Sequence, residues 1–112
     1  MSYKIKSRIW IESNNNVLLG QGRVQLLKAI NETGSLSKAA KSLNISYKKA
    51  WTLLDSVNKS AKYSVTVNSV GGKGGGGAKL TAYGKSLIDV FDEINKNCWA
   101  FLDKELKKIE NI

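Results

Sequence analysis

Glycine and lysine are the residues in this chain whose pattern could do chemistry. Six of the seven residues from 71 to 77 are glycine, and the seventh is Lys73. Bare glycine backbone can approach a phosphate closely, while a lysine supplies positive charge. The run contains a GxGxxG pattern, but a dinucleotide fold needs that pattern to open a helix, and a short strand follows here instead. We therefore do not expect nucleotide binding, which leaves a flexible loop or a phosphate-contacting hairpin tip.

The composition excludes several kinds of active site. The chain has no His and a single Cys, Cys98. A zinc site built from His and Cys, an intrachain disulfide and a His-based catalytic triad are therefore ruled out. The few acidic residues form no evident pair. We expect no enzyme, no metal site and no cofactor.

Positive charge is concentrated in the middle of the chain. The net charge is +9, from 18 Lys and Arg against nine Asp and Glu. Residues 36–87 hold nine lysines against Asp55 alone, a net +8. Such clustering favours a binding surface for nucleic acid, an anionic membrane or an acidic partner over a generic solvated face. With no apolar run long enough for a membrane span and no apolar leader, we expect a soluble cytoplasmic protein.

The elements that must position these lysines begin with a predicted β-hairpin. Residues 3–12 alternate apolar and polar, as a half-buried strand does, and residues 17–19 can pair back after an Asn-rich turn. A helix is predicted over residues 23–32, with Gly34 as the glycine that follows its C-terminus. A second helix, capped by Ser35 or Ser37, extends to about Leu43. Only two residues separate it from Ser46, the cap of a third helix, and this is typical of a helix-turn-helix.

A second hairpin and a long helix complete the predicted chain. After Lys62 the period becomes two, which predicts strands up to Val70 and over residues 78–80 around the glycine run. Thr81 caps a last helix that extends to about Lys108. Its apolar residues exceed what so small a domain can cover, so we expect it to form a homodimer through an apolar stripe made of Leu87, Phe91, Ile94, Cys98, Leu102 and Leu106.

The third helix is the best candidate for contact with DNA. At 100° per residue its apolar residues form one stripe, and Lys48, Thr52, Asp55 and Lys59 gather on the opposite side, the polar face. The DNA major groove admits such a helix. An ordinary solvated face is the alternative, and the hairpin that follows the helix favours DNA. We predict DNA contacts from the third helix, the helix before it and the hairpin, namely Tyr47, Lys48, Lys49, Thr52, Lys38, Lys41, Lys73 and Lys79. Trp10 and Trp51 are expected to be core or edge aromatics.

Two segments, residues 34–51 and 71–81, resemble the DNA-binding part of ModE-type molybdate-responsive regulators. The first segment alone would also suit LysR-type regulators. The resemblance covers about residues 8–88. It implies a mainly α fold with small β-hairpins (α+β), a winged helix-turn-helix that dimerises through its terminal helices and controls promoters. It places Ser46 with the other residues of the recognition helix, and Lys73 at the wing tip.

The predicted organisation is a winged helix-turn-helix in residues 1–80 and a dimerisation helix in residues 81–112. The first part comprises a hairpin (3–19), the helix-turn-helix (35–62) and the wing (63–80). Regulators of this family continue into C-terminal domains that hold molybdate or tungstate, and this sequence contains no counterpart. The resemblance therefore supports DNA binding and a link to molybdate transport or metabolism, without molybdate sensing by this chain alone.

The resulting hypothesis is a homodimeric transcription regulator that reads a palindromic site on double-stranded DNA. Two alternatives stay open at this point. One is an architectural nucleic-acid binder that ignores sequence. The other is an interaction module that pairs through its long helix with a separate sensor chain.

Overall fold

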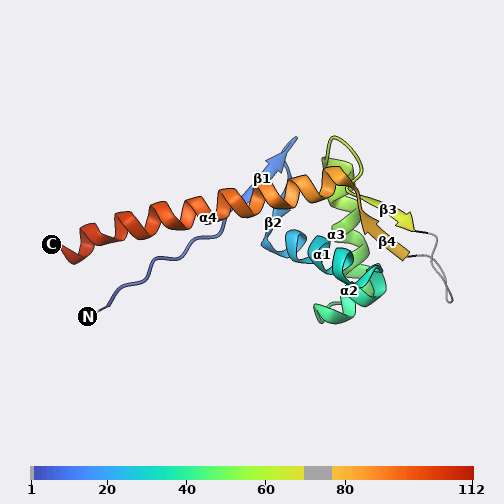
Figure 1. Cartoon of the computed structure of the whole chain (residues 1–112), viewed down its shortest axis with the longest axis horizontal. Coiled ribbons are helices and arrows are strands. Elements are labelled where there is room, and N and C mark those ends of the chain that lie inside the picture. The colour runs from blue at the N-terminus through green and yellow to red at the C-terminus, as the bar shows by residue number, and fades with distance from the viewer. Residues whose placement is uncertain (1, 70–76) are drawn as a thin grey trace.

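The computed structural model describes residues 2–69 and 77–112, which form four helices and two antiparallel hairpins. Helices α1, α2 and α3 gather around one end of α4, which projects far beyond them (Figure 1). The molecule is elongated as a result, with extents of 62 × 29 × 22 Å. Along the chain the elements are β1 (Trp10–Ser13), β2 (Asn16–Gly20), α1 (Gln21–Thr33), α2 (Leu36–Ser42), α3 (Tyr47–Ser60), β3 (Thr66–Ser69), β4 (Gly77–Leu80) and α4 (Ala82–Glu110).

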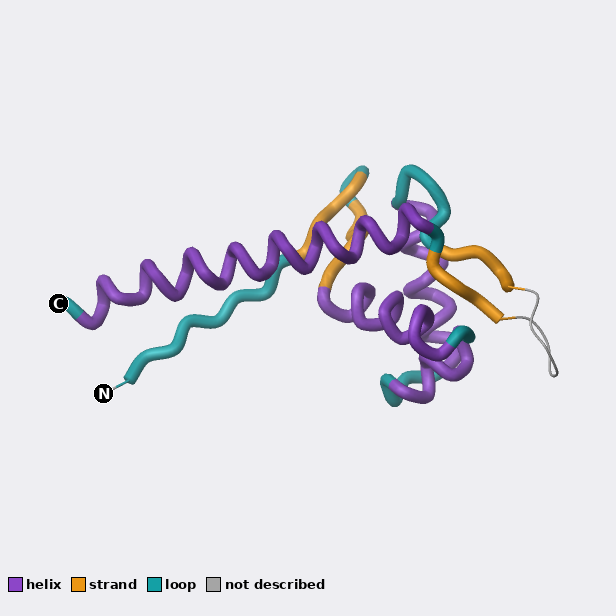
Figure 2. The backbone as a smooth tube through the Cα atoms, in the orientation of Figure 1, coloured by secondary structure: helices purple, strands orange, loops and turns teal. Residues whose placement is uncertain are grey.

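The N-terminal hairpin is shorter than predicted. The strand expected from residue 3 begins at Trp10, which pairs with Gly20, the last residue of β2. Because α1 starts at the next residue, β2 offers no further backbone with which residues 3–9 could pair. The alternation of half-buried and exposed residues nevertheless continues from Ile5 to Ile9, whereas Tyr3 and Lys4 are both exposed. The segment extends next to α4 (Figure 2), with Ser7 Oγ lying 3.9 Å from Cys98 Sγ.

Glycine ends α1 as predicted. Gly34 follows the helix with φ of 78°, in the left-handed region that glycine tolerates best. Its N–H donates to the carbonyl of Ile30 and so closes the last turn. The chain leaves the helix at once and can begin α2 two residues later.

Helices α2 and α3 form the predicted helix-turn-helix. Ser35 Oγ accepts a hydrogen bond from the Lys38 N–H, and Ser46 Oγ accepts one from the Lys49 N–H. Each serine thereby satisfies a backbone donor in the first turn of its helix. Asn44 turns the chain between the helices with a positive φ of 58°, a conformation that asparagine adopts more readily than most residues.

Two clusters of buried side chains hold the domain together. One joins β2, α1 and α3 to the wing and α4, and includes Val57, Val65 and Phe91. The other packs α1 against the helix-turn-helix through small residues that let helices approach closely: Ala29, Ala39, Ala40 and Ala50. Leu54 of α3 packs against both clusters and links them.

The wing is a two-stranded hairpin that leads directly into α4. Thr66 of β3 pairs with Leu80 of β4, and Thr81 then caps α4 by accepting the Gly84 N–H. Val70, the predicted end of the first strand, and residues 71–76 with Lys73 lie outside the described residues. Among the helices of the described chain, none is both long enough and apolar enough to cross a membrane.

Two glycines allow the wing to lie close to the helices. A Cβ at Gly77 would lie 2.4 Å from Ser69 Oγ and 2.7 Å from the carbonyl oxygen of Gly34. A Cβ at Gly84 would lie 2.3 Å from the carbonyl oxygen of Val65. Real Cβ atoms do not approach backbone oxygen this closely, so both positions require glycine.

Replacing Gly84 with Ala should destabilise the fold, because the new Cβ can be accommodated only if α4 moves away from Val65. We expect the free energy of unfolding to fall by about 1–3 kcal/mol, as for an overpacked core. Gly22→Ala is the matched control, since a Cβ there would meet nothing within 4 Å. That change should be neutral or stabilising by up to about 1 kcal/mol, because alanine favours helix. Urea denaturation measures both, and equal stability of the two variants would contradict the close approach.

Candidate nucleic-acid interface

The residues predicted for the recognition helix are exposed and close together on α3. Ser46 caps the helix, and its first two turns carry Lys48, Lys49 and Thr52. All of them are exposed, as is Tyr47. Ala50 and Val57 are buried on the opposite side and anchor the helix. The amphipathic orientation predicted for this helix is therefore confirmed.

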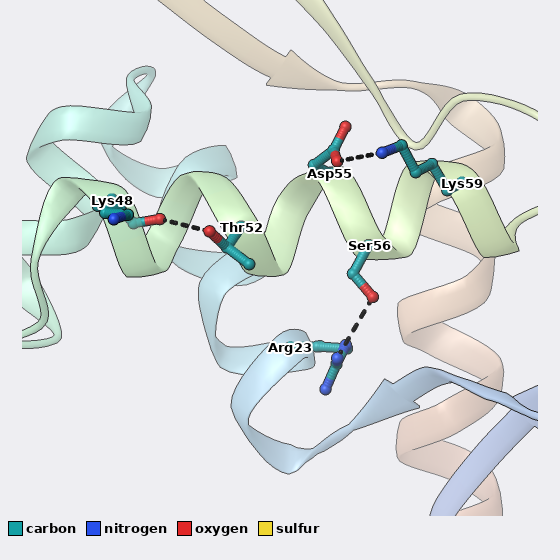
Figure 3. Close-up of polar contacts among 6 residues, drawn as sticks. All are labelled: Arg23, Lys48, Thr52, Asp55, Ser56 and Lys59. Atoms are coloured by element: carbon teal, nitrogen blue, oxygen red, sulfur yellow. Dashed lines mark hydrogen bonds and ion pairs between the residues drawn. The ribbon is translucent and has the colours of Figure 1, made fainter.

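The polar face of α3 carries both donors and acceptors (Figure 3). Thr52 Oγ1 donates to the carbonyl of Lys48 at 2.9 Å, so its hydroxyl has only acceptor capacity left for a ligand. Asp55 pairs with Lys59 one turn later, with 2.9 Å between Oδ2 and Nζ. Because that pair is internally neutral, Lys48 supplies the net positive charge of this face.

Arg23 of α1 reaches α3 beside this face. Its Nη2 lies 3.4 Å from Ser56 Oγ, as Figure 3 shows. Its Nε is buried and has no hydrogen-bond partner among the described residues. The contact connects the first turn of α1 to the third turn of α3 and helps to orient the helix.

The remaining predicted lysines lie on two other elements. Lys38 and Lys41 are exposed on α2, the helix before the recognition helix. Lys79 is exposed on β4, where it pairs with Val67 of β3. Lys73, the predicted wing tip, lies outside the part of the chain that the structure describes. The lysines of the helix-turn-helix and of the wing thus lie on separate elements. Their relative position depends on the contacts between these elements.

Asn58 sets much of that relative position. Its Oδ1 accepts the Val65 N–H at 2.8 Å, and its Nδ2 donates to Thr66 Oγ1 at 3.3 Å. Asn58 lies on α3, whereas Thr66 begins β3. One half-buried carboxamide therefore connects α3 to the wing.

The stripe predicted for dimerisation divides between the chain's own core and its surface. Phe91 is buried in the core, and Leu87 packs against it. Ile88, which lies off the predicted stripe, is buried as well. Ile94 is 44% exposed. Farther along α4, Cys98, Leu102 and Leu106 are half-buried.

Sequence reasoning missed three residues that shape this surface. Trp51, expected as a core or edge aromatic and given no part in the site, is 52% exposed on α3. Arg23 and Asn58 carry no local sequence signal, because their partners lie 33 and 7 residues away.

Comparison with known proteins gives relatives over most of the chain. No family profile matches the sequence. Transcriptional regulator ModE of Yersinia pestis is 47% identical over 70 residues, which cover 62% of this chain and 27% of that protein. Molybdenum transport protein ModE of Azotobacter vinelandii is 30% identical over 106 residues, 95% of this chain and 39% of that protein. The chain thus spans roughly a quarter to two fifths of the length of these relatives.

This chain fits an N-terminal DNA-binding domain of the ModE type. Solved structures agree on the fold. A CbnR DNA-binding domain in complex with DNA superposes with a TM-score of 0.60 at 18% identity, covering 78% of this chain and 94% of that one. ArgP from Mycobacterium tuberculosis gives 0.51 at 19% identity, over 79% of this chain and 30% of that one. The predicted winged-helix fold is therefore confirmed, and the named ModE relatives point to a role other than catalysis.

Removing the Asn58 carboxamide should loosen the contact between the wing and α3. Asn58→Ala leaves the Val65 N–H without its acceptor, which should lower the free energy of unfolding by about 1–3 kcal/mol. Asn58→Asp keeps an acceptor and should lose less. Asn68→Ala, an exposed asparagine of β3, is the control and should stay within about 0.5 kcal/mol of the parent. Thermal or urea unfolding measures the stability of each variant. If Asn58→Ala were as stable as Asn68→Ala, the carboxamide would not link α3 to the wing.

Proposed function

We propose that this chain is the DNA-binding part of a homodimeric transcription regulator that reads a palindromic operator and is linked to molybdate transport or metabolism. The proposal rests on the exposed lysines of the helix-turn-helix, because a winged-helix fold presents them on two successive helices: Lys38 and Lys41 on α2, and Lys48 and Lys49 on α3. The names of the relatives support the regulatory role and its link to molybdate. Such a regulator would act in the cytoplasm, together with the DNA.

Each part of the surface has a proposed task on the duplex. The first turns of α3, from Ser46 to Thr52, enter the major groove and meet base edges. Lys38 and Lys41 of α2 contact phosphates, as do Lys73 and Lys79 of the wing. Phosphate contacts set affinity and its dependence on salt, whereas base contacts set sequence preference.

The proposed dimer uses the part of α4 that its own core leaves free. The helix has 29 residues, which makes it about 43 Å long, and only its first turns contribute buried residues to the core. Beyond Phe91 the stripe continues through Ile94, Cys98, Leu102 and Leu106, with further apolar residues such as Phe101 exposed beside it. Burying these side chains against a second copy removes apolar surface from water, which favours association.

The DNA-binding proposal can be tested by selecting the duplexes that the protein binds from a random pool. The selection is made at about 0.15 M salt, because salt weakens non-specific binding. An enriched site with two-fold symmetry would support a specific dimeric regulator. Binding without a preferred sequence would instead indicate an architectural protein, and the absence of binding would indicate an interaction module. Repeating the selection with molybdate asks whether the oxyanion changes binding by this chain.

Lys48→Ala or Lys49→Ala should weaken binding to the selected site. We expect a loss of about 1–3 kcal/mol that relaxes the preference at one base pair if the side chain reads a base. An equal loss on all duplexes would mark a phosphate contact. Lys107→Ala, at the far end of α4, is the control and should bind like the parent. Titration by fluorescence anisotropy measures each affinity, and unchanged binding by both variants would refute the assignment of α3.

Ile94→Glu should disrupt the dimer, because it places a charge in the part of the stripe that remains exposed. We expect sedimentation equilibrium to give the mass of a dimer for the parent and a shift toward monomer for the variant. Ala100→Glu adds the same charge on another side of α4 and should stay dimeric. A parent that is monomeric at all concentrations would contradict the proposed interface.

A further inference from the structure

An aromatic pair is exposed on α3 next to the polar face. Tyr47 is 57% exposed and Trp51 is 52% exposed, one turn apart on the same helix. Neither side chain belongs to the two core clusters, although Leu54, three residues after Trp51, packs against both. The indole therefore contributes little to packing within the described chain, and its position requires another explanation.

Trp51 lies between the polar face and the wing. At 100° per residue, it is about 60° around the helix from Lys48 and about 100° from Thr52. It also lines an open groove between α3 and β3, together with Leu54, Asp55, Asn58, Thr66 and Asn68. A helix that enters the major groove with Lys48 and Thr52 toward the bases would bring the indole to the edge of neighbouring base pairs.

The chemistry of the indole narrows what it can recognise there. Its large apolar surface suits contact with another apolar group, and its one polar atom is a donor. Base edges in the major groove present hydrogen-bonding groups and a single apolar group, the 5-methyl of thymine. Contact between the methyl group and the ring would remove apolar surface of both from water.

We propose that Trp51 recognises the 5-methyl group of a thymine in each half of the operator. This inference rests on the proposed function, because it needs α3 to lie in the major groove. It assigns Trp51 a role in specificity beside the lysines, which supply charge. Preference for thymine over cytosine or uracil at one position of each half-site follows from it.

Deoxyuridine scanning tests this inference with the protein unmodified. Each thymine of the selected operator is replaced singly by deoxyuridine, which removes only the methyl group. We expect one position in each half-site to weaken binding about fourfold, the factor expected for one buried methyl group, with the other positions unchanged. If no position responded while specific binding persisted, the inference would be overturned and the proposed function would stand.

The variant Trp51→Ala assigns the methyl contact to its side chain. It should bind the thymine and deoxyuridine operators equally at the sensitive position, because the partner of the methyl group is gone. Trp10→Ala is the matched control, since Trp10 is 56% exposed on β1, and it should keep the fourfold difference. A Trp51→Ala protein that kept this difference would overturn the inference.

Two further readouts separate the possible failures. Thermal unfolding of Trp51→Ala checks that the variant folds, as expected when the replaced side chain is half-exposed. Trp51→Leu repeats the comparison of thymine with deoxyuridine in a variant that keeps more apolar bulk. A parent protein that selects no preferred site would refute the proposed function and the inference together. Specific binding with a uniform loss in Trp51→Ala on every duplex would overturn the inference alone, since it would indicate a backbone contact.

Discussion

The peptide groups of Val65 join three parts of the molecule. Its N–H donates to Asn58 of α3, and its carbonyl oxygen accepts the N–H of Thr81, the cap of α4. Gly84 lets α4 pass directly beside that carbonyl. The Val65 side chain is fully buried in the core. Helix α3, the wing and α4 therefore meet at one residue, and their relative orientation depends on it.

A second contact positions the wing against the helix-turn-helix. The N–H of Ala78 on β4 donates to the carbonyl of Gly34, where α1 ends and the chain turns toward α2. The absence of a side chain at Gly77 makes this approach possible. The strand that carries Lys79 is thus connected to the start of the helix-turn-helix as well as to α3. A surface assembled from separate elements acquires a defined geometry in this way.

Local chemistry made much of this fold predictable. Ser46 and Thr81 begin their helices as predicted, and Gly34 ends α1, because a cap bonds to backbone within three or four residues. The alternation predicted for the N-terminal segment is also present in the burial of residues 5–9, yet these residues do not form a strand. Alternation reports which side chains face the protein, whereas a strand also needs a partner backbone, and β2 ends too early to provide one.

By itself the sequence determined the order and limits of the helices, the wing hairpin and the clustering of lysines, since these follow from local hydrogen bonding, periodicity and composition. Only the tertiary structure decided which apolar residues are covered. Phe91 is buried in the core while Ile94 stays exposed on the same stripe, and Trp51 is exposed on a helix where Ala50 is buried. The physical reason is that the residues which cover a side chain lie far from it in the sequence. Burial depends on elements far apart in sequence, and no local pattern records where they meet.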